Sequence, residues 1–98
     1  MGLAWRAARE AINKNWYGQS KYYMIPDKII KAHRKGADIE MEVVYGEADC
    51  RGRGFGFTEI NDRNCKDIRR GADRALYRVI VDRNQWGSEI HAWPIRRF

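Results

Sequence analysis

Apolar side chains at every second position make segment 38–45 the strongest constraint on the fold of this chain. Its apolar side chains are Ile39, Met41, Val43 and Tyr45. Glu40 and Glu42 stand between them. A repeat of two residues places alternate side chains on opposite faces of a β-strand, and it does not fit a helix. The segment therefore predicts a strand with one face on an apolar core.

Further segments have the composition of strands. The expected strands are residues 21–25, 38–45, 53–60, 76–82 and 88–93. A polar loop, 46–52, separates 38–45 from 53–60, so we expect these two strands to form an antiparallel hairpin. Gly87 marks the turn between the last two strands. Pro94 predicts that the last strand is at a sheet edge, because proline has no N–H to donate to a neighbouring strand.

Three segments have the pattern of helices: residues 3–16, 26–35 and 63–75. The first has apolar side chains at steps of three and four residues, which is typical of an amphipathic helix. These are Trp5, Ala8, Ile12 and Trp16. Pro26 suits the first turn of the second helix and Gly36 suits its end. The third has an apolar line of Cys65, Ile68 and Ala72.

Together these elements predict an α+β fold: a mainly antiparallel sheet of about four strands, with two to three helices packed on one side. The length of 98 residues fits one small basic domain, 1–98. No stretch approaches the roughly 20 apolar residues that span a bilayer, and the first residues lack the apolar core of a signal peptide. We therefore expect a soluble, cytoplasmic protein that does not bind membranes, with Cys50 and Cys65 reduced.

The charge balance favours a polyanionic partner. The chain has 19 Lys and Arg against 13 Asp and Glu, a formal net charge of +6, and a basic domain attracts nucleic acid. The expected third helix adds a basic line on one side. That line is Arg63, Lys66, Arg70 and Arg74. It suits a phosphate backbone, and a solvated helix face is the alternative explanation.

The octapeptide at 53–60, Arg-Gly-Phe-Gly-Phe-Thr-Glu-Ile, alternates a basic residue and aromatic rings with glycine. It resembles the RNA recognition motif family, and the order of elements extends this partial resemblance over 38–82. Thr58 and Ile60 depart from the family's aliphatic and aromatic positions. The resemblance implies that Phe55 and Phe57 stack on unpaired bases while Arg53 holds a phosphate. Packing of both rings in the core is the alternative.

These observations predict a small basic nucleic-acid-binding module that prefers RNA or another single-stranded nucleic acid, and not an enzyme. The residues expected to contact nucleic acid are Arg51, Arg53, Phe55, Phe57, Arg63, Lys66, Arg70 and Arg74. Four to six phosphate contacts with a single strand would give a log–log salt slope of about −3 to −4. No cofactor or metal is expected, since the cysteines and histidines lack the paired spacing of zinc ligands.

Two alternatives stay open. The chain could be an inhibitor or adaptor of the kind that phages encode, which binds a host nucleic-acid-handling protein through Trp86, Trp93 and Tyr45 as anchors. The end of the chain, 76–98, is also similar to RelE-like ribonuclease toxins. That resemblance implies catalytic roles for a set of polar side chains. These are Tyr77, Arg78, His91, Arg96 and Arg97.

Overall fold

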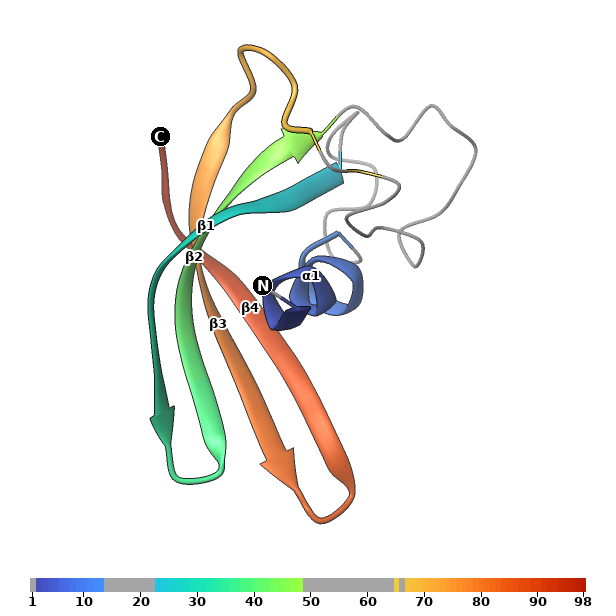
Figure 1. The fold of residues 1–98 in the computed structure, drawn as a ribbon, viewed down its shortest axis with the longest axis vertical. Coiled ribbons are helices and arrows are strands. Elements are labelled where there is room, and N and C mark those ends of the chain that lie inside the picture. Colours follow the sequence, from blue (N-terminus) through green and yellow to red (C-terminus); the bar gives the residue numbers. More distant parts are fainter. Residues whose placement is uncertain (1, 14–22, 49–64, 66) are drawn as a thin grey trace.

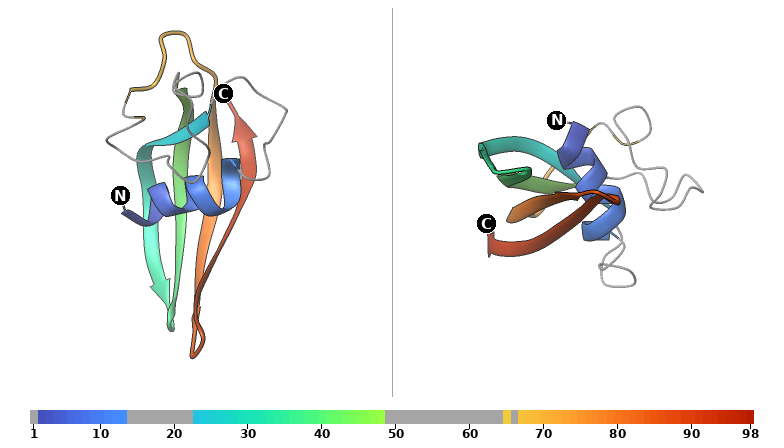
Figure 2. Two further views of the ribbon diagram at one scale, coloured as in Figure 1. Left: turned by 90° about the vertical axis from the view of Figure 1, so that its right-hand side faces the viewer. Right: turned by 90° about the horizontal axis from the view of Figure 1, so that it is seen from below.

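The structure is a computed structural model that describes residues 2–13, 23–48, 65 and 67–98 of the chain. One helical segment precedes four long strands (Figure 1). The elements are α1 (Gly2–Ala7), the π-helical turn η1 (Ala8–Ile12), β1 (Tyr23–Lys35), β2 (Asp38–Ala48), β3 (Arg74–Asn84) and β4 (Gly87–Arg97). The helix crosses one face of the sheet, and no element of the described part covers the other face (Figure 2).

The four strands form a single antiparallel sheet in the order β1-β2-β3-β4. A tight turn at Gly36 joins β1 to β2. Its φ of +66° is a left-handed conformation that glycine adopts without steric cost. β1 and β4 are the two sheet edges, and each contains one of the two prolines, Pro26 and Pro94. The missing N–H of each proline is tolerated there, as Pro94 predicted.

The core lies between the helix and the covered face of the sheet. The strands contribute Met41, Val43, Tyr45, Ala75, Tyr77, Val79 and Val81. The helix contributes Ala4, Ala7, Ala8 and Ile12. The alanines let the helix approach the sheet closely, so the aromatic rings of β2 and β3 fill the space between the layers. Tyr45 and Tyr77 meet edge to face, with ring centroids 5.4 Å apart, the favourable arrangement for aromatic pairs.

Asn13 fastens the end of the helix to the first strand. Its amide nitrogen donates to the carbonyl oxygens of Ala8, at 2.8 Å, and of Met24, at 2.9 Å. Its side-chain oxygen accepts a 2.7 Å hydrogen bond from the Met24 N–H. Because Met24 lies in an edge strand, Asn13 takes the place of a neighbouring strand for both of its backbone groups.

A second, smaller cluster lies at the far end of β1 and β2. Ile25, Ala48 and Cys65 are buried there, and Ile68 packs against them. Ile68 also forms an isolated antiparallel bridge with Ala48. The segment that leads into β3 is thereby held against the sheet.

The expected helix at 26–35 is wrong, because these residues belong to β1. Pro26 fits an extended edge strand as well as a first helical turn, and the β-branched Ile29 and Ile30 favour strands. Pairing with β2 runs along nearly the whole of β1, so tertiary contacts outweigh a weak helical pattern. β2 is flanked by β1 and β3, so its partner is not 53–60, which lies outside the described residues.

The expected helix at 63–75 is also wrong for Cys65 and for 67–75, the part of it that the structure describes. Gly71 has a φ of +74° in a turn, which interrupts any right-handed helix, and Arg74 already belongs to β3. One N-terminal helical segment therefore replaces the expected two to three helices in the described chain. The α+β character and the strands at 38–45, 76–82 and 88–93 are confirmed. The first helix is confirmed as far as Ile12, and residues 14–16 of the expected range lie outside the described residues.

Two further findings concern the oxidation state of the cysteines and the presence of membrane-spanning helices. Cys65 is in a disulfide bond, which differs from the expected reduced state; the other cysteine, Cys50, lies outside the described residues. Among the described helices, none has the length and apolar character needed to cross a bilayer.

Candidate functional site

The face of the sheet opposite the helix, called the open face below, carries the polar half of each alternating strand. Its middle consists of two cross-strand rows. One row is Lys31, Glu42, Arg78 and Trp93. The other is His33, Glu40, Ile80 and His91. The pairing brings side chains from all four strands onto one surface, although they lie far apart in the sequence.

Two glutamates of the open face each have a basic partner on the edge strand β1. Lys31 Nζ lies 3.3 Å from Glu42 Oε2. His33 Nε2 lies 3.0 Å from Glu40 Oε2. The carboxylates on β2 are therefore flanked by basic groups, which reduces their repulsion of an approaching phosphate.

A shallow groove of about 270 Å³ runs over these pairs. It is lined by Lys31, His33, Lys35, Glu40, Met41, Glu42 and Arg78. Cations border it on both sides and carboxylates occupy its middle. Such a groove can hold a chain that presents phosphates at its margins and hydrogen-bond donors toward its centre.

Trp93 is the exposed aromatic of the open face. It is 43% exposed and is the direct cross-strand partner of the exposed Arg78. Side chains directly opposite each other on antiparallel strands have Cβ atoms roughly 4.5–5.5 Å apart. An indole ring next to a guanidinium group can stack on a base while the cation contacts the adjoining phosphate.

Several exposed cations have no carboxylate within ion-pair distance in the part of the chain that the structure describes. They are Lys28, Arg34, Lys35, Arg70, Arg78, Arg83 and Arg96. Cross-strand register assigns Lys28, Lys35, Arg78 and Arg96 to the open face. These charges are available for a polyanion without first breaking an existing ion pair.

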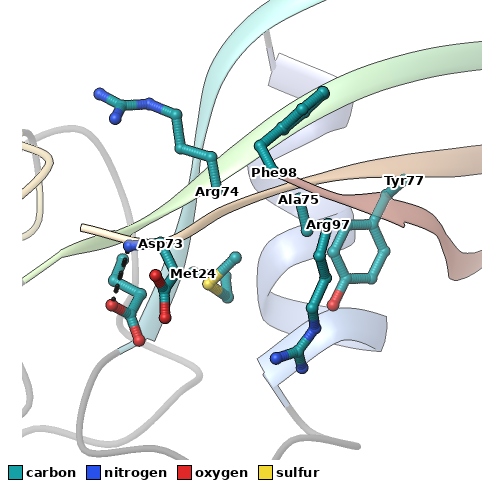
Figure 3. Close-up of a pocket in the computed structure, with 8 residues that line it drawn as sticks. Met24, Asp73, Arg74, Ala75, Tyr77, Arg97 and Phe98 are labelled. Atoms are coloured by element: carbon teal, nitrogen blue, oxygen red, sulfur yellow. Dashed lines mark hydrogen bonds between the residues drawn. The ribbon is translucent and has the colours of Figure 1, made fainter. Parts of the chain in front are cut away.

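A pocket of about 180 Å³ lies on the helix-bearing face, beside the last residues of β4 (Figure 3). It is lined by Met24, Glu47, Asp73, Arg74, Ala75, Tyr77, Arg97 and Phe98. We call it the C-terminal pocket. Arg97 is the cross-strand partner of Ala75, and Figure 3 shows its guanidinium group and the Tyr77 hydroxyl pointing to the same side.

Tyr77 is buried in the core, but its hydroxyl lies at the wall of the C-terminal pocket. Burial raises the pKa of this hydroxyl, and the positive charge of Arg97 offsets part of the rise. The hydroxyl therefore stays protonated near neutral pH and can donate a hydrogen bond to a ligand in the pocket.

Most of the predicted site lies outside the described residues, namely Arg51, Arg53, Phe55, Phe57, Arg63 and Lys66. Arg70 is exposed in a turn, and Arg74 begins β3. Arg74 Nε lies 3.1 Å from an Asp27 carboxylate oxygen. Because 67–75 is not helical, the predicted basic line does not form there.

The side chains considered for a ribonuclease do not meet at one place. Tyr77 and Arg97 line the C-terminal pocket, whereas the register of β3 and β4 puts Arg78, His91 and Arg96 on the opposite face.

Of the expected protein-binding anchors, Tyr45 is fully buried, so that role is wrong for it. Trp86 and Trp93 are exposed.

The cations of β1 were not anticipated as binding residues, because 26–35 was predicted to be a helix. Lys28, Lys31 and Lys35 share one face only in the pairing of β1 with β2, which includes two register shifts. The signal in the sequence was the density of basic residues between Pro26 and Gly36. That these side chains lie on one face could be known only once the segment was seen to be a strand.

No family model, curated protein or solved structure matches this chain. The assignment of a function therefore rests on its own residues.

Proposed function

We propose that the protein binds single-stranded nucleic acid, RNA in preference to DNA, on the open face of its sheet. The observation that carries the proposal is the pairing of the exposed Trp93 with Arg78, bordered by cations without ion pairs. Stacking on aromatic side chains and contact of basic groups with phosphates are the two elements of single-strand recognition.

The arrangement suggests how single-stranded RNA would lie on the open face. One base stacks on Trp93, and its phosphates contact Arg78 and Arg96 on one side and Lys28 or Lys35 on the other. Glu40 and Glu42 accept hydrogen bonds from 2′-hydroxyl groups, which only RNA has. This last point supports the preference for RNA.

The experiment is a fluorescence-anisotropy titration with labelled single-stranded RNA and DNA of about 12 nucleotides, within the site sizes of comparable single-strand binders. With four to six phosphate contacts, the log–log salt slope should be about −3 to −4. RNA should bind more tightly than DNA of the same sequence. Absence of binding at about 50 mM salt, where phosphate contacts are strong, would overturn the proposal.

Variants locate the surface. Trp93→Leu should weaken RNA binding by about 1–3 kcal/mol, the usual contribution of one stacked base. Arg78→Gln should weaken binding and make the salt slope shallower by about 0.7. Trp86→Leu and Arg70→Gln are matched controls away from the open face and should leave affinity unchanged. Thermal melts of all four variants exclude loss of the fold.

A protein partner is the second candidate, and Trp86 favours it. This residue is 87% exposed in the turn between β3 and β4, and large exposed aromatics are frequent interface anchors. If this candidate is correct, RNA binding is weak and Trp86→Leu impairs capture of the partner. The cytoplasm stays our proposed location, and the redox state of Cys65 tests it separately.

A further inference from the structure

The two histidines of the chain, His33 and His91, lie in the same cross-strand row of the open face. They belong to the two edge strands, β1 and β4, and Glu40 and Ile80 lie between them. Both histidine side chains are more than half exposed, at 57% and 52%. A ligand that lies along this row therefore meets a histidine at each edge of the sheet.

Charged groups from three strands face His33. Its Nε2 atom lies 3.0 Å from Glu40 Oε2, and both residues line the shallow groove of the open face. The other charged neighbours are Lys31 and Lys35 on β1, Asp38 and Glu42 on β2, and Arg78 on β3. His33 therefore has one carboxylate in direct contact and cations on both sides along its own strand.

The surroundings of His91 follow the same plan at the other edge. Its Nε2 atom lies 3.6 Å from Glu89 Oε2 on the same strand. Its register partner on β3 is the apolar Ile80, and the diagonal neighbours on β3 are Arg78 and Asp82. Each histidine thus stands beside one glutamate, whose charge it compensates only when the imidazole is protonated.

The open face is balanced in charge when both histidines are neutral. Its four cross-strand rows, from the row of Lys28 to the row of Lys35, contain five cations and five carboxylates. Protonation of both histidines adds two positive charges to this balanced surface. The histidines therefore decide whether the face as a whole attracts phosphates. The cations are Lys28, Lys31, Lys35, Arg78 and Arg96, and the carboxylates are Asp38, Glu40, Glu42, Asp82 and Glu89.

We propose that protonation of His33 and His91 regulates the binding of RNA on the open face, so that affinity rises as the pH falls. The inference rests on the proposed function. Histidine is the side chain whose charge ordinarily changes between about pH 5 and pH 8. A protonated imidazole donates from both ring nitrogens, so one nitrogen can contact the glutamate while the other contacts a phosphate. By linkage, RNA that binds the protonated form more tightly must take up protons when it binds.

The test is a titration of the full chain with labelled oligouridylate of about 12 nucleotides, at about pH 5.5 and about pH 7.5. Uridine is chosen because its base gains no proton in this range. Affinity should be at least about fivefold higher at the lower pH, a typical coupling between two binding equilibria. The log–log salt slope should become steeper by up to about 1.4, or about 0.7 for each histidine that contacts a phosphate. Calorimetry in buffers of different ionisation enthalpy should detect proton uptake.

Substitution of the histidines makes the result specific. His33→Gln and His91→Gln should each reduce the difference in affinity between the two pH values. The double variant, which contains no histidine, should abolish that difference. Arg70→Gln, in an exposed turn away from the open face, is the matched control and should keep the full pH dependence. Thermal melts at both pH values exclude loss of the fold.

The outcomes separate this inference from the proposed function. Equal affinity at both pH values, with RNA binding retained, would overturn the inference and leave the proposed function intact. Undiminished pH dependence in the double variant would also overturn it, since another group would then be responsible. Absence of RNA binding at both pH values would contradict the proposed function, and the inference would fall with it.

Discussion

The hydroxyl of Tyr45 donates a 2.8 Å hydrogen bond to the carbonyl oxygen of Ala4. Tyr45 lies in β2 and Ala4 in α1, so this bond joins the two layers of the fold through the core. Both residues are fully buried. Together with the alanine contacts of the helix, the bond sets where the helix crosses the sheet.

Removal of this hydroxyl should destabilise the protein. Tyr45→Phe should lower the free energy of unfolding by about 1 kcal/mol, the typical net contribution of a buried hydrogen bond. Tyr77→Phe is the matched control, because its ring lies in the same cluster and its hydroxyl lies at the wall of the C-terminal pocket. It should change stability by less than about 0.5 kcal/mol. Equal losses in urea denaturation would contradict this distinction.

The same two tyrosines predict an alkaline limit of stability. Burial raises the pKa of both hydroxyls above the ordinary value of 10.0. The folded protein therefore holds these protons more tightly than the unfolded chain does. Their contribution to stability is complete below pH 10.0 and is lost as the pH rises above it. Ultraviolet difference absorbance should show tyrosines that ionise only together with unfolding; ionisation of every tyrosine near pH 10.0 in the folded state would contradict the prediction.

Asn13 should be one of the most sensitive polar positions of the chain. Asn13→Leu removes both hydrogen bonds to the backbone of Met24. At about 1–3 kcal/mol for each of the two buried groups left without a partner, the expected loss of stability is about 2–6 kcal/mol. Asn84→Ala is the control, since Asn84 accepts one hydrogen bond from the Trp86 N–H in an exposed turn. It should cost less than about 0.5 kcal/mol.

Gly46 and Ile68 should be coupled. A Cβ atom at Gly46 would lie 2.9 Å from Cδ1 of Ile68, so Gly46→Ala should cost about 1–3 kcal/mol through overpacking. In an Ile68→Ala background the same substitution should cost close to nothing, because the opposing side chain is gone. A double-mutant cycle by thermal denaturation measures this coupling. Additive losses would show that Ile68 does not pack on Gly46.

Cys65 should give no thiol reaction in the oxidised protein. Its disulfide predicts that Ellman's reagent finds no free cysteine in denaturant without a reductant. After reduction, both cysteines of the chain should react. Free thiols before reduction would contradict the disulfide and would agree with the cytoplasmic location proposed above.

Local patterns determined which side chains face the core in the strands with clear alternation. The period-two pattern of 38–45 assigned Met41, Val43 and Tyr45 to one face, and the structure buries all three there. The spacing in the first segment predicted its helix, and Pro94 predicted an edge strand. Each of these features depends on the chain within a few residues, so it can be read without knowledge of the partners.

Only the tertiary structure decided the conformation of 26–35 and the neighbours of β2. A stretch with a weak helical pattern becomes a strand when a long apolar strand can pair with it, and the energy of that pairing is absent from the local sequence. The same holds for both candidate sites. Trp93 meets Arg78 through register, and Tyr77 meets Arg97 at the pocket. Sequence alone determined the basic charge and the alternation, because both are local; strand order and register, which depend on the whole sheet, decided where the charged and aromatic side chains gather.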